Sequence, residues 1–156
     1  MTQPNSPGAR PDARGLNMTL LAARYHVAVV DGLVEGARAA WLAAGGEPDR
    51  LRLEYVPGAF ELPLAAQAMA RGGGQDGIVA LGCVIRGETL HFELVAGECA
   101  RGLLQVGLAE HLPVAFGVLT TENEAQAVAR SVPGPANKGA EALDAAVAMA
   151  RLLRSC

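Results

Sequence analysis

The sequence predicts an α/β protein built on parallel strands with crossover helices. Short apolar or β-branched runs alternate along the chain with stretches of helical periodicity, which is the pattern of that class. Two of the runs, VAVV at residues 27–30 and IVAL at residues 78–81, are apolar on both faces, as strands between two helical layers must be. A chain of 156 residues, 51% of them hydrophobic, can bury one core but is short for two ordinary domains. We therefore expect a single domain.

The strands are predicted from the positions of the apolar runs. Residues 1–24 lack periodicity and are rich in polar residues and proline, so they are interpreted as a flexible N-terminal tail, with the domain at residues 25–156. The strands are expected at His26–Val30, Leu51–Tyr55, Ile78–Gly82 and Val114–Val118.

The helices are predicted from apolar spacing and from capping residues. Their expected ranges are 33–44, 60–71, 89–111, 121–131 and a last helix after Asn137. Thr121 and Glu124 fit a capping box at the start of the fourth helix, and Asn137 suits the N-cap of the fifth. The glycine run at residues 72–74 is expected to end the second helix.

Composition excludes several functions. The net charge of −3 and the absence of a basic run argue against a nucleic-acid surface. The cysteines, Cys83, Cys99 and Cys156, lack the spacing of a zinc site or a disulfide framework, which favours reduced thiols in the cytoplasm. We find no signal-peptide pattern and no apolar stretch of membrane-spanning length. Only 4% of the residues are aromatic, so the core is made of small residues and association with other copies would help it.

The candidate site lies where parallel strands end, because ligands of open parallel sheets bind outside the carboxyl ends. After the third predicted strand, a glycine-flanked turn opens a helix at His91, and free N–H groups at such a helix start favour an anion. His91 would stand beside that anion as a proton carrier, although a lone histidine in a helix is often structural. His26 and His111 lack such a setting and are interpreted as structural. The turn thus predicts an enzyme acting on a small phosphorylated molecule.

Three charged residues near other helix ends allow two interpretations each. Glu61 can cap a helix or accept substrate hydroxyls. Lys138 follows the cap Asn137, where the helix dipole disfavours a cation, which suggests that it holds an anion. Arg130 ends a helix, where a cation is favourable in any case.

Four motifs together resemble those of a known enzyme family, 6,7-dimethyl-8-ribityllumazine synthase of riboflavin biosynthesis. They are VPGAFELP (Val56–Pro63), ALGCVIRGETLHFE (Ala80–Glu93), VAFGVLTTEN (Val114–Asn123) and ANKGAEA (Ala136–Ala142). The resemblance implies a flavodoxin-like three-layer fold with a four-stranded parallel sheet. It implies a transferase that condenses a ribitylaminouracil with 3,4-dihydroxy-2-butanone 4-phosphate, with no metal or redox cofactor. It also implies a homo-oligomer, a pentamer or an icosahedral shell, with riboflavin synthase as a candidate partner.

The same resemblance implies a role for each matching residue. His91 would be the general acid/base, and Arg130 would reach the phosphate from the adjacent subunit. The phosphate site would comprise Gly87, Glu88, Thr89 and Arg130, and the pyrimidine and ribityl site would comprise Ala59, Phe60, Glu61, Cys83, Val84, Ile85, Phe116 and Lys138.

The chain also departs from the family pattern. The family has an Arg, an aromatic residue and an Asn shortly after the first strand, whereas the predicted strand runs straight into Asp31–Leu33, with no aromatic side chain. We therefore expect weakened pyrimidine binding. Further departures are Cys83 in place of a common Thr, the acidic Glu88 beside the phosphate, and the 132–135 turn.

Two other functions stay open. The alternative function is that of a weakly active relative that binds flavin or lumazine, or forms shells, and the third is that of another phosphate-binding α/β enzyme.

Overall fold

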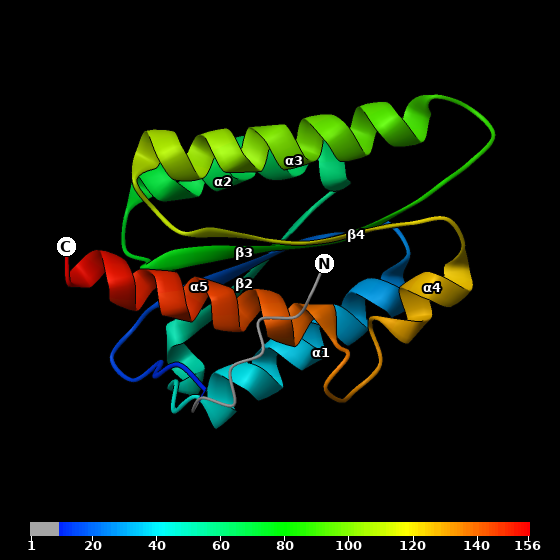
Figure 1. Cartoon of the computed structure of the whole chain (residues 1–156). Coiled ribbons are helices and arrows are strands. Elements are labelled where there is room, and N and C mark those ends of the chain that lie inside the picture. Colours follow the sequence, from blue (N-terminus) through cyan, green and yellow to red (C-terminus); the bar gives the residue numbers. More distant parts are fainter. Residues whose placement is uncertain (1–9) are drawn as a thin grey trace.

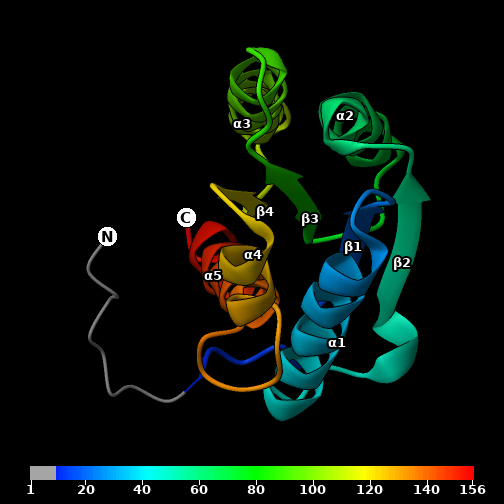
Figure 2. The ribbon, with the colours of Figure 1, turned by 90° about the vertical axis from the view of Figure 1, so that its right-hand side faces the viewer.

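The computed structural model describes residues 10–156, which form a four-stranded parallel sheet between two layers of helices. Figure 1 shows the three layers, and Figure 2 shows them along the strands. The strands are β1 (Met18–Ala23), β2 (Leu51–Val56), β3 (Gly77–Ile85) and β4 (Val114–Thr121), in the order β2-β1-β3-β4. All three pairings are parallel. The predicted α/β class and the flavodoxin-like arrangement are confirmed.

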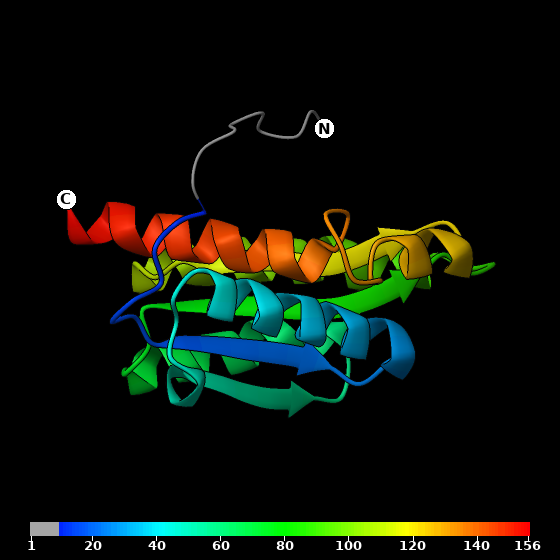
Figure 3. The same cartoon turned by 90° about the horizontal axis from the view of Figure 1, so that it is seen from below.

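The helices divide between the two faces of the sheet. One face is covered by α1 (Val27–Ala43), α4 (Glu124–Ala129) and α5 (Lys138–Arg154), and the other by α2 (Leu62–Gly72) and α3 (His91–Glu110). Two 3-10 turns, η1 (Pro48–Arg50) and η2 (Ala59–Glu61), flank β2. Figure 3, seen from below, shows α1 and α5 side by side in front of the sheet. Within residues 10–156, none of the helices has the length and apolar character that crossing a membrane requires.

The first strand lies earlier in the chain than predicted. All six residues of β1 are buried, and β1 pairs with both β2 and β3, so the predicted tail of residues 1–24 was wrong from residue 18 onward. Residues 1–9 of that tail lie outside the described residues. The predicted strand His26–Val30 is instead the start of α1, whose buried residues continue to Trp41 with helical spacing. A short apolar run does not distinguish strand from helix. Of the two neighbouring runs, we assigned the strand to residues 26–30, whereas residues 18–23 form it.

Each central strand contributes to two separate cores. In β1, Leu20 packs against α1 and α5, while its neighbour Leu21 packs on the α2 and α3 side. In β3, Val79 and Ile78 divide in the same way. Successive side chains of a strand point to opposite faces, so both faces of a central strand must be apolar. This confirms the prediction that helices cover both sides of residues 78–81.

Two glycines allow α1 and α5 to approach each other closely. A Cβ atom at Gly139 of α5 would lie 2.0 Å from the carbonyl oxygen of Leu33 in α1. A Cβ atom at Gly36 of α1 would lie 2.0 Å from Oδ1 of Asn137. Any side chain at either position would force the helices apart, because real Cβ atoms do not approach so closely.

Asn137 ties this helix pair together as the N-cap of α5. Its Oδ1 accepts a hydrogen bond from the Ala140 N–H at 3.0 Å. Its Nδ2 donates to the carbonyl oxygens of Gly32 (3.0 Å), Ser131 (3.0 Å) and Val132 (3.1 Å). The residue is only 2% exposed. The predicted cap is confirmed, and its amide also bonds α1 to the loop before α5.

The predicted cap of α4 was wrong. Asn123, and not Thr121, is the N-cap, and its Oδ1 accepts from the Gln126 N–H at 2.9 Å. Thr121 is the last residue of β4, opposite Ile85 of β3, and its hydroxyl donates to the Asn123 carbonyl at 3.0 Å. The strand is longer than the apolar run that predicted it, which moves the helix start by two residues.

Replacing Asn137 should destabilise the fold more than replacing an ordinary cap. Asn137→Ala removes the cap and leaves three carbonyl groups without their shared donor, which we expect to cost ~2–3 kcal/mol. Asn123→Ala, at an exposed cap, should cost only ~1 kcal/mol. Asn137→Asp should cost at least as much as Asn137→Ala, because it puts a buried carboxylate oxygen against the carbonyl oxygens that Nδ2 bonded. Urea unfolding midpoints measure the difference, and equal losses for the two Ala variants would contradict the role given to the Asn137 amide.

Candidate active site

A cavity of about 720 Å³ opens at the carboxyl ends of the strands. This end is on the right in Figure 1 and faces the viewer in Figure 2. The cavity lies between the β1–α1 loop, the β2–α2 turn, the end of β3 and the first turns of α3. It is lined by Tyr25, His26, Gly58, Ala59, Phe60, Glu61, Cys83, Val84, Ile85, His91, Leu94, Val95 and Glu98.

Seven of the sequence-predicted site residues line this cavity. They come from the β2–α2 turn, from β3 and from α3, and they are Ala59, Phe60, Glu61, Cys83, Val84, Ile85 and His91. Because these segments are separated in sequence but converge at the end of a parallel sheet, the structure brings together what the motifs predicted as one site. The lining combines apolar side chains with two imidazoles, His26 and His91, and two carboxylates, Glu61 and Glu98.

The β2–α2 turn places a carboxylate beside an aromatic ring. A Cβ atom at Gly58 would lie 3.1 Å from Oε2 of Glu61 and 3.3 Å from each of two ring carbons of Tyr25. Gly58 thus leaves the space in which both side chains lie against the turn. Glu61 makes no side-chain cap hydrogen bond to α2, so its carboxylate is not used as a helix cap. This arrangement favours the ligand interpretation of Glu61 over the capping one.

Sequence reasoning missed Tyr25 and His26, which follow β1 directly. Tyr25 is 69% exposed and lines the cavity with its ring. His26 begins α1 in the left-handed conformation, with φ 53° and ψ 59°, and it also lines the cavity, which the sequence did not predict. The Arg24-Tyr25-His26 sequence supplies the Arg and aromatic pattern expected after the first strand. The predicted shortened loop at Asp31–Leu33 was therefore wrong, since those residues lie within α1.

Cys83 lies at the buried wall of the cavity. It is almost fully buried, and this burial, with a smaller contribution from the charge of Glu124, raises the pKa of its thiol to about 11. A raised pKa keeps the thiol protonated at neutral pH, since the thiolate forms only as the pH approaches that value. Cys83 therefore acts there as a small neutral side chain and not as a nucleophile.

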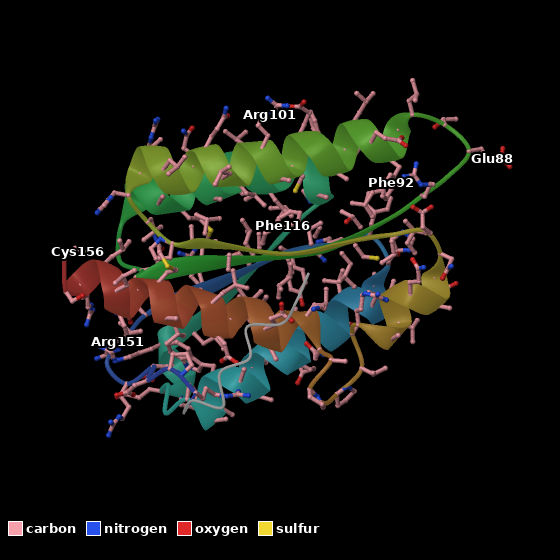
Figure 4. All side chains as sticks on the ribbon, in the orientation of Figure 1. Glu88, Phe92, Arg101, Phe116, Arg151 and Cys156 are labelled. Carbon is pink, nitrogen blue, oxygen red and sulfur yellow. The ribbon has the colours of Figure 1, made fainter. Side chains whose placement is uncertain are left out.

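The predicted phosphate turn borders the cavity. Gly87, Glu88 and Thr89 line an open hollow that shares His91 and Leu94 with the main cavity. The His91 backbone N–H donates to the Thr89 hydroxyl at 3.3 Å, which shapes the last part of the turn. Glu88 lies at the outer tip of the turn in Figure 4. The turn, the helix start and the imidazole are therefore adjacent, as the sequence predicted.

The structure does not bring the other three predicted residues into this cavity. Phe116 lies on the edge strand β4 and is 47% exposed (Figure 4). Arg130 follows α4, and its Nη1 donates to the Gln126 carbonyl at 2.9 Å. Lys138 pairs with Glu141 of α5, with 2.7 Å between Nζ and Oε2. Both cations belong to the α1–α5 side of the sheet, whereas the phosphate turn leads into α3 on the other side (Figure 1).

The fold and the site define the class of the protein. A three-layer α/β fold, with an imidazole, a carboxylate and an anion-suited turn around a cavity at the strand ends, is the arrangement of an enzyme acting on small phosphorylated molecules. Within residues 10–156, no group of three or more His, Cys, Asp or Glu side chains is placed to hold a metal ion.

Comparison with known proteins identifies the family. A model of the 6,7-dimethyl-8-ribityllumazine synthase family matches residues 15–154. Proteins of that name are 45% identical in Thermus thermophilus, over 92% of this chain and 91% of theirs, and 46% identical in Pectobacterium atrosepticum, over 94% of each. The protein of that name from Azorhizobium caulinodans is 44% identical over 98% of this chain and 96% of its own. The chain belongs to the 6,7-dimethyl-8-ribityllumazine synthase family, as the four sequence motifs predicted.

Proposed function

We propose that the chain catalyses the lumazine synthase reaction of riboflavin biosynthesis. In this reaction, 5-amino-6-(D-ribitylamino)uracil condenses with 3,4-dihydroxy-2-butanone 4-phosphate, and phosphate and water are released. The observation that carries the proposal is the family match over residues 15–154 together with a cavity that gathers the matching residues His91, Glu61 and Phe60. The reaction assigned to this chain is a transferase reaction.

The cavity offers a different surface to each part of the pyrimidine substrate. The Tyr25 and Phe60 rings and the apolar end of β3 suit the flat heterocycle, because aromatic rings stack with offset geometry on such surfaces. The backbone groups of Cys83, Val84 and Ile85 can contact the polar edge of the heterocycle. The Glu61 carboxylate can accept hydrogen bonds from ribityl hydroxyls.

His91 is the residue proposed to move protons. Its imidazole stands where the cavity meets the phosphate turn, between the two proposed substrates. Condensation of the amine with the ketone needs proton transfers as water leaves the carbinolamine, and elimination of phosphate needs a base at the adjacent carbon. An imidazole can serve both steps, since it gives and takes protons near neutral pH.

The phosphate site requires cations that the turn itself does not supply. Gly87, Glu88 and Thr89 offer backbone N–H groups, but Glu88 adds a negative charge. Arg130 is the proposed source of positive charge for the phosphate, and it does not line the cavity of its own chain. We propose that Arg130 reaches the phosphate, and Phe116 the pyrimidine, from a neighbouring copy.

A second copy of the chain also fits an apolar groove beside β4. The groove, of about 460 Å³, lies between α3 and α5 and is lined by side chains that include the exposed Leu104, Leu108 and Met149. Burial of such side chains is favourable by roughly 25 cal/mol per Å². We propose a homo-oligomer, either a pentamer or an icosahedral shell, as the assembled enzyme.

Riboflavin synthase, which would use the product, is a proposed partner, and the free cysteines support a proposed cytoplasmic location.

The alternative function, a weakly active relative that binds flavin or forms shells, is not favoured. Its basis was the loss of the aromatic residue after the first strand, and Tyr25 occupies that place. Relatives named for the synthase at 44–46% identity favour an active enzyme.

Removing the imidazole should stop the chemistry and leave binding largely intact. His91→Ala should lower kcat by roughly 100-fold or more, as expected for loss of a general acid/base. Absorbance of the lumazine product measures the rate with both substrates. A wild-type protein that binds both substrates without turnover would instead support the alternative function.

Tyr25 should contribute stacking to pyrimidine binding. Tyr25→Ala should raise the KM for the pyrimidine by about fivefold to tenfold, since stacking contributes on the order of 1 kcal/mol. Tyr25→Phe is the matched control, because it keeps the ring and removes only the hydroxyl, and its KM should stay near the wild-type value. Equal KM values for the Ala and Phe variants would argue against stacking.

A site shared between copies predicts complementation between two inactive variants. His91→Ala and Arg130→Ala should each have low activity, but an oligomer refolded from an equal mixture should recover about a quarter of the wild-type activity. The recovery arises where an intact His91 of one copy meets an intact Arg130 of its neighbour. Sedimentation gives the size of the mixed oligomer. No recovery in a fully assembled mixture would mean that both residues act within one chain.

A further inference from the structure

Arg86 is the one arginine at the phosphate turn, and its guanidinium contacts two other segments. It follows the last residue of β3, and its backbone N–H donates to the Thr121 carbonyl at 2.8 Å. Its Nε donates to Oε2 of Glu122, just after β4, at 2.7 Å. Its Nη1 donates to Oε1 of Glu93 in the first turn of α3. The end of β3, the end of β4 and the start of α3 are thus joined by one side chain.

The guanidinium also lies on an aromatic ring of α3. Its central carbon is 4.5 Å from the centroid of the Phe92 ring, a distance typical of a cation–π contact. Figure 4 shows Phe92 below the start of α3, on the side that faces the sheet. Stacking on one face and hydrogen bonds along two edges fix a planar guanidinium in position and orientation, which the flexible ammonium of a lysine cannot reproduce.

The turn between these contacts has little else to hold it. Gly87, Glu88, Thr89 and Leu90 are all exposed, and a Cβ atom at Gly87 would meet no atom within 4 Å. Two hydrogen bonds tie the end of the turn to α3: the His91 N–H donates to the Thr89 hydroxyl at 3.3 Å, and the Leu94 N–H donates to the Leu90 carbonyl at 3.2 Å. The hydrogen bond from Arg86 to Glu93 links the residue that precedes the turn to the helix that follows it.

The charges argue against Arg86 as the phosphate ligand. Its two carboxylate partners raise the pKa of the Arg86 guanidinium, and the guanidinium lowers the pKa of Glu93, so both remain charged around neutral pH. One positive charge, on Arg86, stands against three negative charges, on Glu88, Glu93 and Glu122. Two edges of the guanidinium are already bonded to carboxylates, and the local field would repel a phosphate.

We propose that Arg86 is a positioning residue. Held by Glu93 and Glu122 over Phe92, its guanidinium sets the shape of the Gly87–Leu90 turn and fixes the first turn of α3. It thereby holds the phosphate-binding N–H groups at the correct distance from the His91 imidazole. This inference rests on the proposed lumazine synthase activity, because it concerns how the same site is organised. Misplacement of such groups by about 1 Å can cost up to about 100-fold in rate.

Kinetics of three variants test the proposal. Arg86→Lys, Glu93→Gln and Glu122→Gln should each lower kcat and raise the KM for the butanone phosphate. For Arg86→Lys, the two effects together should lower kcat/KM by about tenfold. The KM for the pyrimidine should stay within about twofold, since its cavity does not contain these residues. Glu88→Gln is the control for charge, because it removes one negative charge beside the phosphate site and leaves the bonds of Arg86 to Glu93 and Glu122 intact.

Whether the KM for the butanone phosphate rises or falls distinguishes a positioning role of Arg86 from direct phosphate binding. A guanidinium that binds phosphate directly would be freed by Glu93→Gln or Glu122→Gln, and the KM for the butanone phosphate would then fall at least as much as in Glu88→Gln. Such a fall would overturn the proposal. A rise in that KM, against a fall or no change in Glu88→Gln, supports it. Sedimentation of each variant confirms that its assembly is unchanged.

Amide hydrogen exchange tests the clamp without relying on turnover. In Arg86→Lys, the amides of residues 87–93 should exchange faster than in the wild type, while the amides of β1 should not change. Inorganic phosphate should slow exchange in the turn of the wild type more than in the variant. Unchanged exchange in the turn would overturn the proposal, even if the wild type shows activity. Absence of turnover in the wild type would reject the proposed function alone, because the exchange result stands independently.

Discussion

The fold depends on the burial of both faces of β1 and β3. Their backbone groups are satisfied by parallel pairing, and their side chains alternate between two cores, so helices must cover the sheet on both sides. Parallel strands joined by covering helices place every strand end, and every following loop, at one edge. The cavity is a consequence of that constraint, since Tyr25, Glu61 and His91 each follow a different strand.

The electrostatics of the site link its chemistry to assembly. Arg86 is neutralised by Glu93 and Glu122, and Glu88 leaves the turn acidic. The N–H groups at the start of α3 favour an anion, but they compete with this negative charge. A phosphate therefore needs further positive charge, and the predicted source, Arg130, lies outside the cavity of the same chain. A neighbouring copy can supply the missing charge, which makes assembly a condition for substrate binding under the proposed function.

The sequence predicted the class of fold and the centre of the site, because both are carried by local patterns. Residues 78–81 are apolar on both faces, and the motif that ends at His91 contains its own turn and helix start. The first strand was misplaced because MTLLAA and VAVV are both apolar runs, and only pairing in the sheet decides between them. That single error hid Tyr25, since a residue directly before a supposed strand would lie at the edge of the sheet opposite to the carboxyl ends.

Other parts of the site could not be predicted because they depend on contacts between distant segments. The partners of Arg86 include Glu122, 36 residues away, and no local pattern indicates that pair. The same holds for Asn137, whose role as a cap was evident from sequence but whose bond to Gly32, 105 residues away, was not.

Asn137 also connects the stability of the fold with the geometry of the site. Its amide bonds to α1, the helix that begins directly after Tyr25 and His26, and its own backbone precedes Lys138. The Asn137 amide occupies the space that a Cβ atom at position 36 would need, so Gly36 is required for this contact. The position of Lys138 relative to α1 is therefore set by a buried hydrogen-bond network and not by the exposed Lys138–Glu141 pair, since exposed ion pairs contribute little. A change that loosens the α1–α5 contact should therefore shift both Tyr25 and Lys138. Because Lys138 lies outside the cavity of its own chain, the core would couple that cavity to the proposed site of a neighbouring copy.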